Sequence, residues 1–247
     1  MNKLTHRLGW KLGGSILGGS WRAFRGDLPR PPLGWLLIVV AIACTASGFF
    51  LDRWAIRGAS KITEDVRCFF EIATRLGDAT GWLIILVGAA LLCVTLSRRP
   101  RFQASRDRLI RHAWNCWFVI LTCLVSGAIH HVLKIVIGRY RPRYLFSDDL
   151  YGISPLNFEI AQNSFPSGHT QTIVSICVAL YLVYPKPWPL LLILAVLVGA
   201  SRVVLGAHFP SDVLGGAYLA ICTAILLKRH YLEPKVTRVL NRAESGR

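Results

Sequence analysis

Acidic side chains are scarce in this 247-residue sequence, and charged residues of any kind make up only 17% of it. Thirteen Asp and Glu residues stand against 29 Lys and Arg residues, which gives a formal net charge of +16 at pH 7. Hydrophobic residues make up 53%, and the mean hydropathy is +0.45. So much apolar surface with so few charges favours a membrane protein over a soluble domain. The basic excess alone fits nucleic acid, anionic lipid or a phosphorylated substrate as partner.

Cysteine pairs with metal-binding or redox spacing are also missing. The seven cysteines include no C-x-x-C pair, and six of them lie inside apolar runs. The seventh, Cys68, has no cysteine partner on its side of the membrane in the topology expected below. We therefore expect neither a disulfide framework nor a zinc site, and we interpret the cysteines as small apolar packing residues.

Six apolar stretches are long enough, or nearly long enough, to cross a bilayer. They are Leu33–Leu51, Gly81–Leu96, Ala113–Ile137, His169–Tyr184, Trp188–Val204 and Asp212–Leu227. The first continues too far, after a long preceding segment, for a cleaved signal peptide and is expected to be a retained anchor. The sequence therefore predicts an all-α polytopic membrane protein with six transmembrane helices in a domain at residues 33–228.

The basic residues predict the orientation of these helices. Six Lys or Arg residues precede the first stretch, six lie between the second and third, and six follow the end of the last. By the positive-inside rule these segments face the cytoplasm. We expect basic cytoplasmic segments at residues 1–32 and 229–247, and an integral protein of a bacterial inner membrane.

A shorter amphipathic segment lies between the first two stretches, in the loop Asp52–Thr80. Thr63 is a candidate N-cap and Gly77 a candidate stop. Between them apolar residues recur on one helical face, which predicts a short helix on the external membrane surface. The same pattern also fits a packing element, and the choice between packing and lipid entry stays open.

Asp, Glu, Lys and Arg are absent from the middles of all six stretches and gather at helix ends. Such residues near hydrocarbon are costly and mark functional sites. Because successive helices alternate in direction, the ends of the third and fifth and the starts of the fourth and sixth share the external face. The residues brought together there are Lys134, Arg141, Pro142, Pro166, Ser167, Gly168, His169, Ser201, Arg202, His208 and Asp212.

This combination suits phosphoryl transfer. Cations can hold the equatorial oxygens of a phosphoryl group, and arginine offers forked donors. The N–H groups of a helix that starts at Ser167–Gly168 can bind an anion. Histidine can attack or pass protons, and Asp212 can accept a hydrogen bond from the His208 ring and fix its tautomer. Each residue alone has an ordinary structural interpretation, so the prediction depends on their coincidence on one face.

Three motifs lie in order along this part of the chain: K-x6-R-P from Lys134 to Pro142, P-S-G-H from Pro166 to His169, and S-R-x5-H-x3-D from Ser201 to Asp212. Together they resemble the signature of the type 2 phosphatidic acid phosphatase family, part of the acid phosphatase–vanadium haloperoxidase superfamily. No signature position departs from that pattern. The six expected spans favour the membrane lipid phosphatase branch over the soluble haloperoxidases.

The resemblance implies a role for each site residue. His208 would attack phosphorus and become a phosphohistidine, Asp212 would orient it, and His169 would protonate the leaving group. The phosphate would be held by Lys134, Arg141, Ser167, Gly168 and Arg202. The resemblance also implies no metal and no cofactor, and the nearby acidic residues Asp148, Asp149 and Glu159 form no compact cluster for Mg²⁺.

The leading hypothesis is a phosphatase of a lipid phosphate or lipid pyrophosphate. Candidate substrates are undecaprenyl pyrophosphate, phosphatidic acid, phosphatidylglycerol phosphate and lipid A phosphate. One alternative is a transporter or channel for an anionic solute, but the apolar stretches lack the mid-membrane charges that a transport site usually needs. The other alternative is a catalytically dead lipid-binding protein. No nucleic-acid partner is expected, because most basic residues flank membrane spans.

Four further residues near the motifs receive structural interpretations. Arg139 and Arg143 flank Arg141; a second phosphate or lipid head groups are possible ligands, but solvated loop charges are the favoured interpretation. His130 and His131, one turn before Lys134, are interpreted as helix-packing residues. The polar loop Tyr144–Phe165 is expected to shape the mouth of the pocket.

Overall fold

The computed structural model describes residues 33–232, so the expected basic segments at 1–32 and, for the most part, 229–247 lie outside the described residues. The chain divides into two units, residues 1–39 and 40–247. Of the first unit, only the start of helix α2 is described. The second unit holds every residue of the candidate site described below. Between residues 33 and 232 there are helices and no strand, as the sequence predicted.

Each of the six expected apolar stretches coincides with a helix. Only the start of α6 differs by more than two residues, since this helix begins seven residues before the expected stretch. The helices are α2 (Leu33–Ala46) continued by η1 (Ser47–Leu51), α5 (Ala79–Ser97), α6 (Arg106–Ile137), α8 (Gly168–Val183), α9 (Trp188–Val204) and α10 (Pro210–Leu227).

Four of these segments are long and apolar enough to cross a membrane: Leu33–Ala59, Ala79–Ser97, Pro100–Ile137 and Pro210–His230. The helices α8 and α9 are apolar but shorter, with 16 and 17 residues. The chain is therefore an integral membrane protein with at least these four segments suited to the bilayer.

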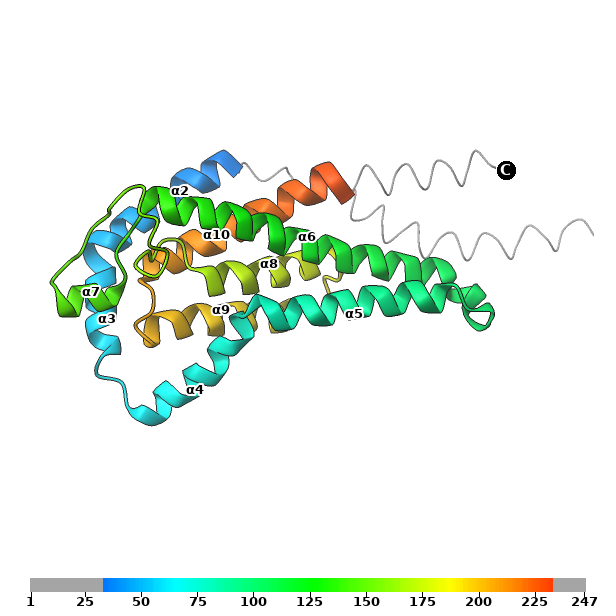
Figure 1. Ribbon diagram of the computed structural model, residues 1–247, viewed down its shortest axis with the longest axis horizontal. Coiled ribbons are helices and arrows are strands. Elements are labelled where there is room, and N and C mark those ends of the chain that lie inside the picture. The colour runs from blue at the N-terminus through cyan, green and yellow to red at the C-terminus, as the bar shows by residue number, and fades with distance from the viewer. Residues whose placement is uncertain (1–32, 233–247) are drawn as a thin grey trace, which may run out of the picture. The chain divides into compact units, whose positions relative to one another are not determined.

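Helix α8 lies among the others and packs against α6, α9 and α10 (Figure 1). Nearly every residue from Thr170 to Ala179 is buried. Part of its contact with α6 is polar, since the Gln171 amide donates to the Ser126 and Ser175 hydroxyls, which lie 2.7 Å apart. Such hydrogen bonds hold helices together where no water competes. The start of α8 is thereby fixed between the ends of its neighbours.

The expected amphipathic helix is α4 (Glu64–Thr74), extended by the short turn η2 (Arg75–Gly77). Thr63 occupies the N-cap position, but its side chain makes no capping hydrogen bond. Helix α4 packs against α9, and η2 packs against α8. Val66, Phe69 and Ile72 of the same helix are exposed. Both interpretations of its pattern therefore have support, because one face packs while an apolar row stays uncovered.

The segment between α6 and α8 holds α7 (Pro142–Ser147) and folds back on the end of α6. Gly138 ends α6 in the left-handed conformation, with φ of 60°, and a Cβ at that position would lie 1.8 Å from the Ser154 carbonyl oxygen. The returning strand-like stretch bonds to the outgoing one, with the Ser164 N–H 2.6 Å from the Arg139 carbonyl oxygen. This pairing places residues 162–164 beside the first motif.

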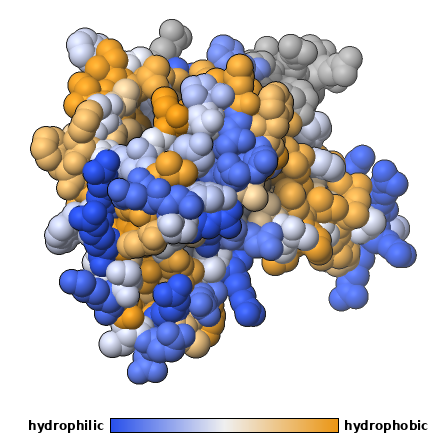
Figure 2. Space-filling model, turned by 60° about the vertical axis from the view of Figure 1, so that its left-hand side comes forward, coloured by the Kyte–Doolittle hydropathy of each residue, from blue (hydrophilic) through white to orange (hydrophobic). Residues whose placement is uncertain are grey.

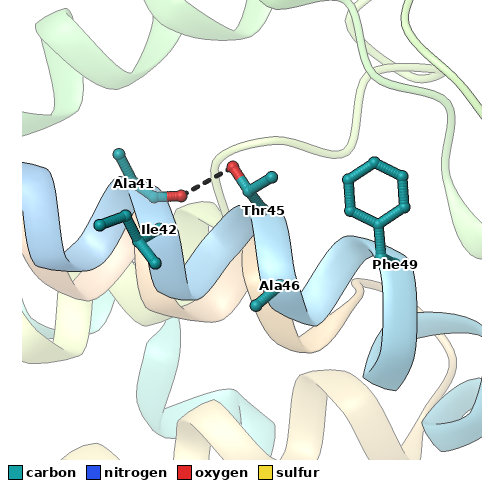
Figure 3. A pocket seen from close by; sticks show the side chains of 5 residues that line it. All are labelled: Ala41, Ile42, Thr45, Ala46 and Phe49. Carbon is teal, nitrogen blue, oxygen red and sulfur yellow. Dashed lines mark hydrogen bonds between the residues drawn. The ribbon is translucent and has the colours of Figure 1, made fainter.

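Helix α3 (Asp52–Ala59) continues the first apolar helix and packs Ile56 against Leu145 of α7 and Phe209. Hydrophilic side chains gather over this end of the second unit, where α3, α4 and α7 lie, and hydrophobic ones cover its flanks (Figure 2). A separate shallow groove on the first helix is lined by Ala41, Ile42, Thr45, Ala46 and Phe49 (Figure 3). None of these five residues belongs to the three motifs.

Candidate active site

The three motif groups come together where α8 and α10 begin and α6 and α9 end. The Ser167 N–H donates to the Asp212 carbonyl oxygen over 3.0 Å, which joins the second motif to the third. The Arg141 Nε donates to the Asn163 carbonyl oxygen over 3.2 Å, which joins the first motif to the segment before the second. Lys134 and His208 are 5% and 2% exposed. The expected convergence of these residues is therefore present.

The start of α8 is held by two close approaches of backbone. A Cβ on Gly168 would lie 3.2 Å from the ring of His130, and a Cβ on Gly216 of α10 would lie 2.5 Å from the Ser167 carbonyl oxygen. The Nε2 atom of His130 also lies 3.1 Å from the Pro166 carbonyl oxygen, within hydrogen-bond distance. His130, interpreted as a helix-packing residue, therefore also contacts the backbone of the P-S-G-H motif. The first N–H groups of a helix have no partner within it, and such a helix start can bind an anion.

His208 lies beside Asp212 but makes no direct hydrogen bond to it, contrary to the expectation. Its Nδ1 lies 3.7 Å from Asp212 Oδ2, beyond hydrogen-bond range. The Ser164 hydroxyl lies between them, 3.3 Å from Nδ1 and 2.5 Å from Oδ2. If the hydroxyl donates to the carboxylate it must accept from Nδ1–H, which leaves the lone pair of Nε2 free. Ser164 precedes the P-S-G-H motif, and no feature of the sequence singled it out.

Burial lowers the pKa of His208 to about 4. The interaction with Asp212 opposes this shift, and the positive charges of Arg202 and Lys134 add to it. At neutral pH the His208 ring is therefore uncharged, as a nucleophilic imidazole must be.

Arg139 is an ion-pairing residue, and its interpretation as a solvated loop charge is wrong. Its side chain is 11% exposed and lies between two fully buried carboxylates. One Nη nitrogen is 2.7 Å from Asp212 Oδ1 and the other is 2.7 Å from Asp52 Oδ2. Buried charges are tolerated when they are paired in this way. Arg143, in contrast, is exposed and donates to the Ala161 carbonyl oxygen within its own loop, as a loop charge would.

Asp52, like Ser164, was not among the residues expected at the site. It directly follows the apolar run Leu33–Leu51, and its placement at the expected external face of a span was the only available signal. Its carboxylate accepts hydrogen bonds from Ser47 at 2.7 Å and from the backbone N–H of Ser211 at 3.1 Å. A carboxylate from the first helix therefore reaches the first turn of α10.

The cations of the site retain unused hydrogen-bonding capacity. Arg202 donates through Nη1 to the Thr74 hydroxyl over 2.7 Å, but its Nε is buried without a partner. Burial and the neighbouring charge of Arg143 lower the pKa of Arg141. A buried donor without an acceptor and a cation beside another cation are both stabilised by an incoming anion.

His169 is the second residue of α8 and is half-buried. Its Cβ would lie 2.9 Å from a Cβ on Gly77, so the end of η2 touches the histidine directly. Together with the bond from Arg202 to Thr74, this contact makes the segment after α4 one wall of the site. Among the described residues 33–232, no group of three or more His, Cys, Asp or Glu side chains is placed to hold a metal ion.

Comparison with known proteins agrees with the motifs. The chain is 31% identical over 224 residues to the lipid A 1-phosphatase of Rhizobium johnstonii, an alignment that covers 86% of this chain and 88% of the relative. It is 33% identical over 129 residues to phosphatidylglycerophosphatase B of Bacillus subtilis, which covers 48% of this chain and 59% of the relative.

The fold also resembles a solved membrane phosphatase. The crystal structure of a transmembrane PAP2-type phosphatidylglycerolphosphate phosphatase from Bacillus subtilis matches with a TM-score of 0.59 at 23% identity, over 82% of this chain and 96% of that one. Residues 115–233 match the PAP2 superfamily. The chain therefore belongs to the PAP2 superfamily, the type 2 phosphatidic acid phosphatases that its three motifs resemble.

Proposed function

We propose that this membrane phosphatase hydrolyses a lipid phosphate or lipid pyrophosphate by nucleophilic attack of His208 on phosphorus. Membership of the PAP2 superfamily makes it a phosphatase of the lipid phosphate class. The observation that supports the mechanism is the buried, uncharged His208 beside the hydrogen-bonded pair Ser164 and Asp212, together with the unpartnered Nε of Arg202.

The proposed first step is transfer of the phosphoryl group to His208. The Nε2 lone pair forms a bond to phosphorus while the bond from phosphorus to the leaving oxygen breaks. His169 donates a proton to that oxygen, and the negative charge of a bound phosphate favours the protonated form of its ring. The ring of His208 becomes positively charged, and the Ser164–Asp212 pair stabilises that charge from the Nδ1 side.

The second step releases the phosphate. Water attacks phosphorus, His169 accepts a proton from it, and the bond from Nε2 to phosphorus breaks, which restores neutral His208. In both steps Lys134, Arg141 and Arg202 offset the charge on the equatorial oxygens, with the N–H groups at Ser167 and Gly168. The unpartnered Nε of Arg202 is a donor available for this purpose.

A six-span topology with an external site best fits these positions. Helices α8 and α9 are about 24 to 26 Å long at 1.5 Å per residue, slightly shorter than a hydrocarbon core. Helix α8 is enclosed by its neighbours, so its length does not have to match the lipid. The domain would then span residues 33–228 between basic cytoplasmic segments, in a bacterial inner membrane with the site on the periplasmic side.

Among the candidate substrates, lipid A phosphate has the most support. The lipid A 1-phosphatase matches nearly the whole chain, whereas phosphatidylglycerophosphatase B matches less than half of it. Undecaprenyl pyrophosphate, phosphatidic acid and phosphatidylglycerol phosphate are the remaining candidates. No observation favours the transporter.

The decisive experiment measures phosphate release from each of these four lipids by detergent-purified protein in the presence of EDTA. We expect release from at least one lipid, undiminished by EDTA, and its loss in His208→Ala. The matched control is His112→Ala, which removes an exposed histidine near the opposite end of α6. Quenching with labelled substrate in alkaline denaturant, which preserves the acid-labile bond from nitrogen to phosphorus, should trap phosphohistidine in the wild type and in His112→Ala but not in His208→Ala. Full turnover by His208→Ala would rule out the mechanism.

A further inference from the structure

Two charged side chains beside the proposed site take no part in the steps above. Asp52 is 0% exposed, yet it comes from the end of the first apolar helix. Arg139 lies between Asp52 and Asp212 and bonds to both. A buried carboxylate costs free energy unless it is paired, so a fully enclosed pair so near His208 requires an explanation.

The guanidinium of Arg139 is fixed on every side. Its Nη1 donates to Asp212 and to the Ser211 hydroxyl, and its Nη2 donates to Asp52 and to the Tyr151 hydroxyl. Its flat faces lie against the rings of Phe209 and Tyr151, with the central carbon 4.4 and 5.3 Å from the ring centroids. A planar group held in this way sets the separation of the two carboxylates.

Asp52 is connected to the same segment by a second route. The Ser211 hydroxyl lies 2.5 Å from Asp52 Oδ2, and the Ser211 backbone N–H donates to Asp52 Oδ1. Because Ser211 precedes Asp212 in the first turn of α10, Asp52 holds both the arginine that grips Asp212 and the backbone that bears it.

The charges matter as much as the contacts. Arg139 paired with Asp212 alone would cancel the negative charge beside His208. With Asp52 included, the three groups carry a net charge of −1, which is retained to stabilise the positive ring of a phosphorylated His208. Burial by itself would lower the pKa of Arg139, but the two carboxylates raise it, so the arginine stays charged.

We propose that Asp52 is a positioning residue for His208, acting through Arg139 on Asp212 from the end of the first membrane helix. The inference rests on the proposed function, since it assigns Asp52 a part in His208 phosphorylation. A role confined to anchoring the first helix would affect stability and leave turnover per folded molecule unchanged.

Asp52→Asn tests this, because it removes the charge and keeps the shape. We expect kcat to fall at least tenfold with KM within threefold of the wild type, and Asp52→Glu to recover most of the loss. The matched control is Asp65→Asn, which removes an exposed carboxylate on α4. Unchanged kcat in Asp52→Asn, or a loss confined to KM, would overturn the proposal. If Asp52→Asn fails to fold, Ser211→Ala is the second test, because it removes a hydroxyl between Asp52 and Arg139 without a change of charge. We expect Ser211→Ala to lower kcat threefold or more. An unchanged kcat in Ser211→Ala would count against the proposed role of Asp52.

A double-mutant cycle shows whether the effect passes through Arg139. Once Arg139→Gln has removed the link through the guanidinium, adding Asp52→Asn should lower kcat by less than it does in the wild type, because only the route through Ser211 remains. A double variant whose loss equals the product of the two single losses would overturn the proposed route. Activity of the wild type is measured in parallel: an inactive wild type contradicts the proposed function, whereas an active wild type with an unaffected Asp52→Asn contradicts only the role of Asp52.

Discussion

Replacement of Ser164 by alanine tests the contact on which the orientation of His208 depends. The hydroxyl is the group nearest to both His208 Nδ1 and Asp212 Oδ2, at 3.3 and 2.5 Å. A hydrogen bond to a charged group contributes about 1.5 to 3 kcal/mol. If that contribution is expressed in the transition state, its loss lowers kcat by about ten- to a hundredfold.

The lower end of that range is the expected result. Asp212 keeps its bonds from the Phe209 N–H at 2.8 Å and from Arg139 at 2.7 Å, so the carboxylate itself remains in place. A small movement of the His208 ring would then bring Nδ1 within hydrogen-bond range of Asp212 Oδ2, which lies 3.7 Å away. We therefore expect Ser164→Ala to lower kcat about tenfold, with a smaller effect on KM.

The assay is steady-state phosphate release from the preferred lipid, with the amount of folded protein measured by size-exclusion chromatography. Ser175→Ala is the matched control, since it removes a buried serine hydroxyl that bonds to Ser126 and Gln171 within the bundle. Ser164→Thr keeps the hydroxyl and should retain more activity than Ser164→Ala. Wild-type kcat in Ser164→Ala, or equal losses in Ser164→Ala and Ser175→Ala, would refute the reasoning.

Two other predictions concern pH and the backbone. Because attack needs neutral His208 and its pKa lies at about 4, the acidic limb of kcat/KM, corrected for ionisation of the substrate, should be centred near pH 4. A separate alkaline limb should report loss of the proton that His169 must donate. An acidic limb centred at 6.5 would contradict the burial of the His208 ring. Gly138→Ala should lower the melting temperature in detergent far more than Gly206→Ala. Both residues have positive φ, but only at Gly138 would the new Cβ collide with backbone. Equal shifts of the melting temperature in the two variants would count against this packing.

The sequence predicted the helices and the convergence of the motifs for identifiable reasons. Each apolar stretch is long and bounded by charges, Gly or Pro, so its helix was predictable within two residues except at the start of α6. There the basic residues from Arg106 onwards continue the helix beyond the apolar region. Alternation of helix direction then placed the charged ends together without any knowledge of packing.

The hydrogen bond expected directly between His208 and Asp212 passes through Ser164 instead, because His208 is not part of a helix. Residues four apart on one helix lie on the same face, but α10 begins only at Pro210. The chain before it is extended at Phe209, with ψ of 156°, so the ring stands off the carboxylate and leaves room for Ser164. The local spacing was correct, but the backbone conformation between the two residues was unknown.

Asp52, Arg139 and Ser164 were beyond prediction for a different reason. Asp52 and Arg139 are 87 positions apart, and neither has an unusual neighbour in the sequence. An arginine in a polar loop resembles any solvated charge until its partners are located in space. Residues that contact only other side chains of the site can therefore be identified only from the tertiary structure. Residues proposed to contact the substrate are indicated in the sequence by their positions at helix ends.

The bond between Thr74 and Arg202 has a mechanical consequence. Thr74 is the last residue of α4, the helix whose apolar row is uncovered, and its hydroxyl holds an arginine proposed to grip phosphate. A fatty chain that tilts α4 shifts Thr74 with it, and the guanidinium must follow or lose its bond. Acyl length could thus alter turnover by moving one arginine, without touching the histidines.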